Sequence, residues 1–184
     1  MKKITFVLTS VFFVAGLVSG ARADNYKYTP YVGVDYTYSR TKANEFKPIH
    51  NSLGLHIGSD YSKYFGTEMF FAQSDADKKR PQEQKIKTSY RAYGLDLMAY
   101  LPLGCTKRFS LLATAGLGEY VYKTKVYQNK HHNEHGYGYR FGGGAKYAFD
   151  NHWQARFITR YVKFDRLTNY KHNMEYNFSL EYHF

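Results

Sequence analysis

Cysteine and long apolar runs are the two most informative shortages in this 184-residue chain. Cys105 is the single cysteine, so no internal disulfide can form, and we interpret its thiol as an incidental turn residue. After residue 23, no apolar run approaches the roughly 20 residues that a membrane-spanning helix requires. The prolines all fall in predicted loops, turns or strand ends, where no sheet hydrogen bond is lost: Pro30, Pro48, Pro81 and Pro102. These shortages exclude a disulfide-stapled secreted fold and a helical membrane protein.

The first 23 residues have the composition of a secretory signal. Lys2 and Lys3 precede an apolar stretch from Ile4 to Val18, and Ala21-Arg22-Ala23 supplies the small residues of a cleavage site. We therefore predict a signal peptide over 1–23 and a mature domain over 24–184. Because the signal carries three basic residues and no acidic one, the formal net charge falls from +11 to +8 in the mature domain.

The last eleven residues alternate strictly between apolar and polar side chains. The apolar set is Met174, Tyr176, Phe178, Leu180, Tyr182 and Phe184, and every residue between them is polar. Successive side chains of a strand face opposite sides, so this segment is predicted to be a strand with one apolar face. A strand that closes a barrel within a membrane could end in this way on an aromatic residue.

The same alternation recurs in seven earlier segments, which we predict to be strands: 29–39, 50–59, 64–74, 88–101, 109–122, 137–149 and 153–163. Short turns alternate with longer polar loops, the latter at about 40–49, 75–87, 123–136 and 164–170. A tilted strand of about ten residues crosses the hydrocarbon layer, and a sheet in lipid must close so that every backbone group is paired. The chain is therefore predicted to be an all-β, eight-stranded antiparallel up-and-down transmembrane barrel.

The polar faces of the predicted strands combine many glycines with a few long charged side chains. Nine charges are placed on the inner face: Asp35, Glu68, Asp96, Arg140, Lys146, Arg156, Arg160, Glu175 and Glu181. Side chains fill a barrel of eight strands, and an unpaired buried charge costs several kcal/mol, so we predict a salt-bridge network. A proton path or ion site is the alternative. We expect Arg140, Arg160 and Glu175 to lie further from the short turns than the other six. Glu119 falls on the apolar face, where a bulge or a strand end would have to accommodate it.

With its signal peptide, eight strands, inner charges and terminal Tyr182-His183-Phe184, the chain resembles the small eight-stranded outer-membrane barrels typified by the OmpA transmembrane domain and OmpX. The resemblance covers essentially all of 24–184 and implies the outer membrane of a Gram-negative bacterium, with lipid and lipopolysaccharide as neighbours. It also implies that the terminal strand is similar to the signal read by the barrel-assembly machinery, carried here by Phe178, Leu180, Tyr182 and Phe184. This fold hosts adhesins, lipid A enzymes and structural proteins, so the resemblance specifies architecture more than activity.

Basic residues concentrate in the predicted outer loops. The candidate ligand-binding set is Lys78, Lys79, Arg80, Lys85, Lys87, Lys123, Lys125, Lys130 and Arg166. Phosphates of lipopolysaccharide and sulfated glycans of host cells both attract such cations. We therefore predict a cell-surface protein with a structural role, an adhesive role or both. A host-cell surface receptor or a sulfated glycan is the predicted adhesive partner, and no nucleic-acid partner is predicted.

Catalysis, metal binding and a soluble barrel are the alternatives to this interpretation. One type of lipid A deacylase uses a His-x-Ser pair on a late strand, but the matching pair here, His50-x-Ser52, begins the second strand. We therefore predict no catalytic residues and no enzyme, with a lipid A-modifying enzyme as the alternative. His131, His132 and His135 fall in a predicted flexible loop without fixed geometry, so no metal or cofactor is predicted. A lipocalin-like barrel would turn its apolar face inward, which the glycines and charges of the polar face disfavour.

Overall fold

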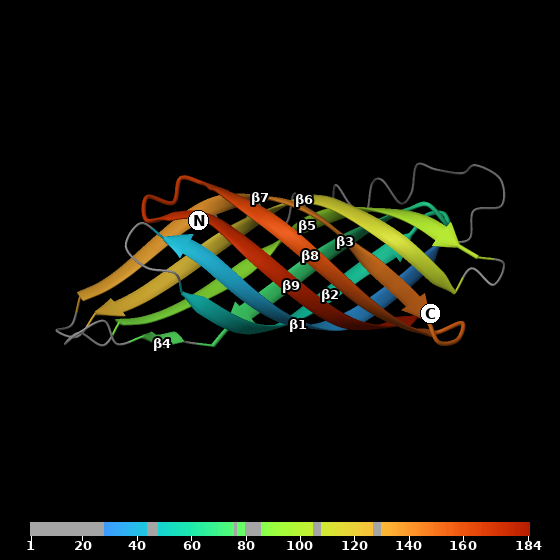
Figure 1. Ribbon diagram of the computed structural model, residues 1–184, viewed down its shortest axis with the longest axis horizontal. Helices are drawn as coiled ribbons and strands as arrows, with labels where there is room; N and C mark the ends of the chain where they lie inside the picture. The colour runs from blue at the N-terminus through green and yellow to red at the C-terminus, as the bar shows by residue number, and fades with distance from the viewer. Residues whose placement is uncertain (1–27, 44–47, 76, 80–85, 105–107, 127–129) are drawn as a thin grey trace, which may run out of the picture.

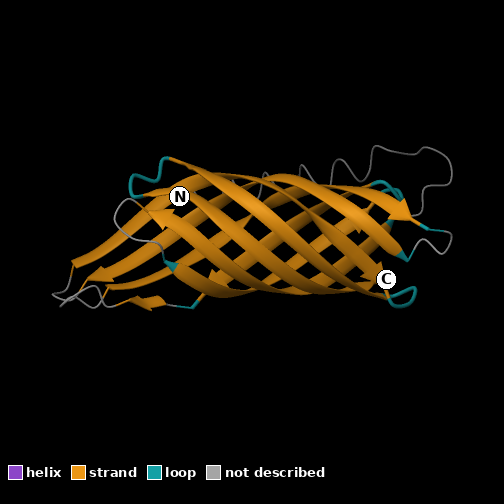
Figure 2. Ribbon diagram, in the orientation of Figure 1, coloured by secondary structure: helices purple, strands orange, loops and turns teal. Residues whose placement is uncertain are grey.

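The computed structural model describes residues 28–43, 48–75, 77–79, 86–104, 108–126 and 130–184. These residues form one closed antiparallel barrel of steeply tilted strands (Figure 1). The strands are β1 (Thr29–Ala43), β2 (Ile49–Asp60), β3 (Phe65–Ser74), β4 (Asp77–Lys79), β5 (Ile86–Leu103), β6 (Phe109–Val126), β7 (Lys130–Ala148), β8 (Trp153–Asp165) and β9 (Tyr170–His183). All of the regular structure in Figure 2 is strand. Within the described ranges there is no helix long and apolar enough to cross a membrane.

Two sets of backbone pairings close the barrel. The first and last strands pair antiparallel from Tyr31 opposite His183 to Ala43 opposite Tyr170. On the other side, β3 and the short β4 both pair with β5, so these two segments are consecutive parts of one barrel wall. The described chain is therefore a closed eight-strand barrel, as the alternation predicts, with its third strand interrupted between Ser74 and Asp77.

The strands extend further at the long-loop end than the sequence predicts. The predicted loop over 123–136 is wrong, because β6 continues to Val126 and β7 already begins at Lys130. The segment 75–87 likewise contains β4 and the start of β5. Both faces of these extensions carry polar residues, so the apolar alternation used to recognise the strands disappears while the backbone pairing continues. As a result, β5, β6 and β7 project beyond the shorter strands at one end of the barrel (Figure 1).

The barrel has its apolar side chains outside and its polar ones inside. Leu53 is 71% exposed and Leu97 is 64% exposed, whereas Glu68 and Arg156 on inward faces are almost fully buried. Water would disfavour this arrangement, and the hydrocarbon of a bilayer favours it. The inner and outer faces agree with the alternation in the sequence.

Side chains fill the interior. At the end towards the projecting strands, a cluster of buried aromatic and aliphatic residues occupies the lumen: Phe70, Tyr90, Ala92, Tyr120, Tyr122, Val162, Phe164, Leu167 and Tyr170. Towards the short turns, a second cluster consists of Met98, Tyr100, Leu112 and Ile158. The charged residues of the inner face lie mainly between these two clusters.

Candidate functional site

The middle of the lumen is organised around Arg156 of β8. Its Nη1 atom lies 2.7 Å from Oε2 of Glu68 on β3 and 2.9 Å from Oε1 of Glu181 on β9. All three side chains are almost completely shielded from solvent. One guanidinium thus compensates two buried carboxylates, and the ion pairs connect strands on different sides of the barrel.

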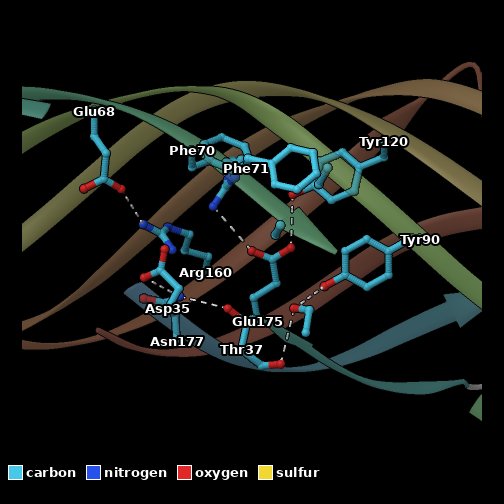
Figure 3. A pocket seen from close by; sticks show the side chains of 14 residues that line it. Asp35, Thr37, Glu68, Phe70, Phe71, Tyr90, Tyr120, Arg160, Glu175 and Asn177 are labelled. Carbon is cyan, nitrogen blue, oxygen red and sulfur yellow. Dashed lines mark hydrogen bonds and ion pairs between the residues drawn. The ribbon is translucent and has the colours of Figure 1, made fainter. Parts of the chain in front are cut away.

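Two further arginines surround Asp96, deeper towards the projecting end. Arg140 and Arg160 place their Nη2 atoms 3.4 Å and 3.3 Å from Oδ2 of Asp96. Arg140 also lies 3.5 Å from Oε2 of Glu175, and its guanidinium stacks over the ring of Phe70. Figure 3 shows Phe70, Arg160 and Glu175 of this group, together with Tyr120, whose hydroxyl donates a hydrogen bond to Glu175.

His56 is a member of this network that the sequence interpretation missed. Its Nδ1 atom lies 2.8 Å from Oδ2 of Asp35, and its Nε2 atom lies 3.4 Å from Oε1 of Glu181. Ser179 and Asn177 donate hydrogen bonds to the other oxygen of Asp35. The inward parity of His56 was a usable signal, because an imidazole among inward carboxylates is a natural hydrogen-bonding partner.

Lys146 lies apart from the central group, next to the short turns. Its ammonium is 3.2 Å from Oδ2 of Asp60 and 4.0 Å from the ring centroid of Tyr100. From the sequence we expect Lys146 at the same depth in the barrel as Glu68 and Arg156. Its contacts are instead with residues nearer the short turns. The predicted inner set also lacks Asp60, because the alternation ends the second strand at residue 59 and leaves Asp60 in the adjoining turn.

The lumen contains a small cavity between these groups. Its volume is about 20 Å³, and its polar lining includes Asp35, Glu68, Arg160, Glu175 and Asn177. This is enough room for one water molecule and far too little for an organic ligand. His56, Glu68 and Glu181 bring three ligand-type atoms within 4.8 Å of one another. Because Arg156 already lies within 2.9 Å of both carboxylates, it occupies the position that a metal ion would take.

Glu119 lies on the outer face in a regular ladder. Its register partners are Tyr93 on β5 and Tyr137 on β7, so the expected bulge or strand end is absent at this position. The hydroxyl of Tyr93 donates a 2.5 Å hydrogen bond to the Glu119 carboxylate, and Nδ1 of His135 lies 3.6 Å from its other oxygen. Polar partners on neighbouring strands, rather than backbone irregularity, accommodate this charge.

The structure places most of the candidate loop residues on strand extensions. Lys78 and Lys79 belong to β4, Lys87 to β5, Lys123 and Lys125 to β6, and Lys130 to β7. The pairings put Lys78 opposite Lys87, Lys87 opposite Lys125 and Lys125 opposite His131, which makes one transverse row across four strands. Arg166 follows β8 with a positive φ of 63° and is exposed. Arg80, Lys85 and the predicted signal 1–23 lie outside the described residues.

The His-x-Ser pair lies inside the barrel. His50 and Ser52 are 1% and 2% exposed, and the Ser52 hydroxyl lies 3.1 Å from the hydroxyl of Tyr90. A hydrolase acting on membrane lipid needs its nucleophile on the lipid-facing surface. This pair is enclosed in the lumen and therefore cannot reach an acyl ester of a surrounding lipid.

The terminal residues form an outward aromatic group at the short-turn end. Phe178, Leu180 and Phe184 are exposed, and the Tyr182 ring contacts Trp153 and Phe184 at centroid distances of 5.2 Å and 5.3 Å. The Phe184 amide donates a 3.0 Å hydrogen bond to the carbonyl of Pro30. The last residue is thus fixed to the first strand.

Comparison with known proteins agrees with this inside-out architecture. The family model described as outer membrane protein beta-barrel domain matches residues 9–184. The chain belongs to this family of outer-membrane β-barrels. It is accordingly a protein of the outer membrane, and the exposed apolar belt is the surface that meets lipid. A search of curated proteins found no match.

Several solved outer-membrane barrels share the fold at low sequence identity. Neisserial surface protein A is similar with a TM-score of 0.71 and 12% identity, over 84% of this chain and 97% of that one. Ail, the attachment invasion locus protein of Yersinia pestis, is similar with a TM-score of 0.62 and 14% identity, over 86% of this chain and 99% of that one. The N-terminal barrel domain of Pseudomonas aeruginosa OprF has a TM-score of 0.56 and 13% identity, over 84% of this chain and 97% of that one. At these identities the likeness concerns the fold alone.

Proposed function

We propose that this outer-membrane barrel is a non-catalytic surface protein that binds anionic glycans through the projecting sheet formed by β4 to β7. The observation that carries the proposal is the basic row made by Lys78, Lys87, Lys125 and His131. Neighbouring strands are about 4.8 Å apart, so successive members of the row recur at that spacing along the sheet. Like charges directly opposite one another destabilise a sheet, and a bound polyanion would relieve that repulsion.

A sulfated glycan is the ligand class that best suits such a row. It carries many negative charges along one chain, and the strand register places basic residues opposite one another across four strands. The mature domain as a whole has a formal net charge of +8, which favours encounter with a polyanion. Ail, a barrel of similar fold, has been solved with the heparin analogue sucrose octasulfate, and this supports testing the same ligand class here.

The test is binding of heparin to the folded barrel in lipid nanodiscs. The triple variant Lys78→Gln, Lys87→Gln, Lys125→Gln should elute from heparin at clearly lower salt than the wild type. If each lysine contributes about 0.5–1 kcal/mol, the triple variant should bind roughly ten- to a hundredfold more weakly. The matched control replaces exposed Lys63 and Arg108 at the short-turn end with Gln and should bind as the wild type does. Equal binding by the triple variant would contradict the proposal and leave a purely structural role.

Export and assembly complete this proposed role. We infer that 1–23 directs secretion and that the barrel-assembly machinery recognises the outward aromatic residues of β9. Residues 24–184 expressed without residues 1–23 should remain in the cytoplasm. Replacing Phe184 with Ser should reduce the amount of folded barrel in the outer membrane several-fold. Tyr176→Ser, on the outward face of β9 but further from the short turns, should have a smaller effect. An unchanged amount of the Phe184 variant would contradict the assembly role.

A lipid A-modifying enzyme is the competing function. The enclosed positions of His50 and Ser52 support the non-catalytic proposal, because a deacylase would need that pair at the lipid surface. Mass spectrometry of lipid A from cells with and without the gene tests the matter directly. A gene-dependent loss or gain of an acyl chain would replace the proposed function with an enzymatic one.

A further inference from the structure

A second basic cluster lies on a different part of the barrel, at the seam where the first and last strands meet. Lys42 of β1 is opposite His172 of β9, and His172 is opposite Lys163 of β8. Lys42 and Lys163 are exposed and His172 is partly exposed. Three basic residues on three adjacent strands thus occupy one row of the outer face.

An irregularity in the seam adds a fourth basic residue. The pairing shifts between Lys42 and Ala43, so that Lys42 faces His172 while Ala43 faces Tyr170. Lys171 is passed over in this register and is exposed. A bulge of this kind changes the direction of a side chain and recurs beside functional sites. Here it adds a lysine to a row that is already basic, at a further cost in repulsion.

The aromatic residues just below the cluster place it at the level of lipid headgroups. The His172 ring lies 5.4 Å from the Tyr161 ring, and Tyr38 lies 6.2 Å from Tyr176. Tyrosines gather where a membrane meets water, with their rings in the apolar layer and their hydroxyls in the headgroup layer. The nearby Arg40 donates a hydrogen bond of 3.1 Å to the Tyr38 hydroxyl, so that cation is held at the same boundary.

We propose that Lys42, Lys163, Lys171 and His172 bind the phosphate group of a lipid in the outer leaflet and thereby fasten the seam between β1, β9 and β8. A phosphate oxyanion accepts hydrogen bonds from several ammonium groups at once and removes the repulsion within the row. Because the cluster faces outward at headgroup level, the phosphate arrives on a neighbouring lipid and not on a ligand of the aqueous phase. Asp165 is an acidic residue two positions beyond Lys163, and its register partner is Tyr137 of β7. It is therefore not paired with any of the four basic residues.

The proposal can be tested with the full mature barrel refolded into phosphatidylcholine vesicles. One set of vesicles contains lipid A with both phosphates, a second contains the same lipid A with its phosphates removed, and a third contains neither but has inorganic phosphate in the buffer. The readouts are the midpoint of heat-induced loss of the folded gel band and hydrogen exchange at the backbone amides of 40–43 and 170–174. Phosphorylated lipid A should raise the midpoint and slow exchange at the seam, and the other two conditions should not.

The triple variant should lose most of this stabilisation; it combines Lys42→Gln, Lys163→Gln and Lys171→Gln. We expect the affinity for phosphorylated lipid to fall about fivefold for each lysine removed, which corresponds to ~1 kcal/mol. The single variant Lys163→Gln gives a smaller loss and serves if the triple variant does not fold. Lys163→Arg should retain the effect, as should the control with Lys63 and Arg108 replaced by Gln.

Three outcomes would overturn the proposal. Wild-type protein could respond equally to lipid A with and without phosphates, which would make the contact one of acyl chains. The triple variant could keep the full response, which would place phosphate binding elsewhere on the barrel. Inorganic phosphate could reproduce the stabilisation, which would make the ligand a free ion.

Discussion

Nη1 of Arg156 lies 2.7 Å from Oε2 of Glu68, and this ion pair crosses the lumen between two strands that are not neighbours in the sheet. The backbone ladder connects each strand only to the next, so it does not by itself set the cross-section of the barrel. The pair formed by β8 and β3, with Glu181 of β9 as the second acceptor, ties separate parts of the wall together. The lumen charges thereby give the barrel internal bracing.

Replacing Arg156 with Met should destabilise the barrel strongly. Glu68 and Glu181 would remain buried without their shared cation, and breaking a buried pair in this way costs about 3–5 kcal/mol. Urea unfolding in vesicles, followed by tryptophan fluorescence of Trp153, measures the change. Arg108→Met, at an exposed position near the short turns, is the control and should change the free energy of unfolding by less than about 0.5 kcal/mol. An Arg156 variant as stable as this control would show that the bracing is unimportant.

Parity in the sequence determined which residues enter the lumen, but it could not determine their partners. Asp35, Glu68 and Arg156 all point inward as alternation requires. Depth in a barrel also depends on how far each strand is shifted against the next, and that shift is a property of the closed sheet. Counting residues along each strand therefore predicts Lys146 at the central level, whereas its ammonium contacts Asp60 near the short turns.

Strand ends were harder to predict than strand faces for a related reason. β6 and β7 stay paired until β6 ends at Val126, which is opposite Lys130, the first residue of β7. The sequence from Lys123 to His135 is mostly polar at both alternating positions, so an apolar face no longer marks the strand. Neither the projecting sheet nor the transverse rows of lysines could be read from alternation alone, because both depend on cross-strand register.

Adjacent glycines on β7 should respond very differently to Ala. A Cβ at Gly144 would lie 1.9 Å from the backbone oxygen of Phe157, whereas a Cβ at Gly143 would meet its nearest neighbour, the oxygen of Leu112, at an ordinary 3.4 Å. We expect Gly144→Ala to cost roughly 1–3 kcal/mol through overpacking against the next strand. Gly143→Ala, its matched control, should be nearly neutral in the same urea titration. Equal effects would contradict the close approach of β7 and β8.

A charge in the outer apolar belt should be costly although the site is exposed. Leu97 is 64% exposed and faces outward on β5, so in water Lys there would be harmless. In the hydrocarbon layer, Lys costs about 2–4 kcal/mol near the bilayer midplane and about 0–1 near its edges. Ser89→Lys, at an outward position nearer the projecting end of β5, should show the smaller cost. Similar free energies of unfolding for the two variants in vesicles would argue against lipid contact at Leu97.

Asp150 organises the turn between β7 and β8. Its carboxylate accepts hydrogen bonds of 2.7 Å from the backbone amides of His152 and Trp153, and these hold its pKa below the usual 3.8. Because the pKa is lowered in the folded state, the stabilisation is complete well above pH 3.8 and is lost as the pH falls through the lowered pKa. NMR titration should give a lower midpoint for the Asp150 carboxyl in the barrel than in the unfolded chain.

The Asp150→Ala variant provides the companion measurement. At neutral pH it should reduce the hydrogen-exchange protection of the Trp153 amide, which loses its acceptor. Asn151→Ala, at the exposed neighbouring position, should leave that protection unchanged. Identical protection in both variants would mean that the carboxylate does not stabilise the turn.

The pairing of the first strand with the last sets the order of folding events. Asp35 accepts a hydrogen bond from Asn177, 142 residues further along the chain, and the pairing of β1 with β9 spans the largest sequence separation among the described strand pairs. Such contacts form slowly, since a long loop must close before they gain any energy. Until β9 arrives, β1 and β8 each present an open edge that can pair with another chain. The interval before closure is therefore the stage at which the newly made protein is most prone to aggregate.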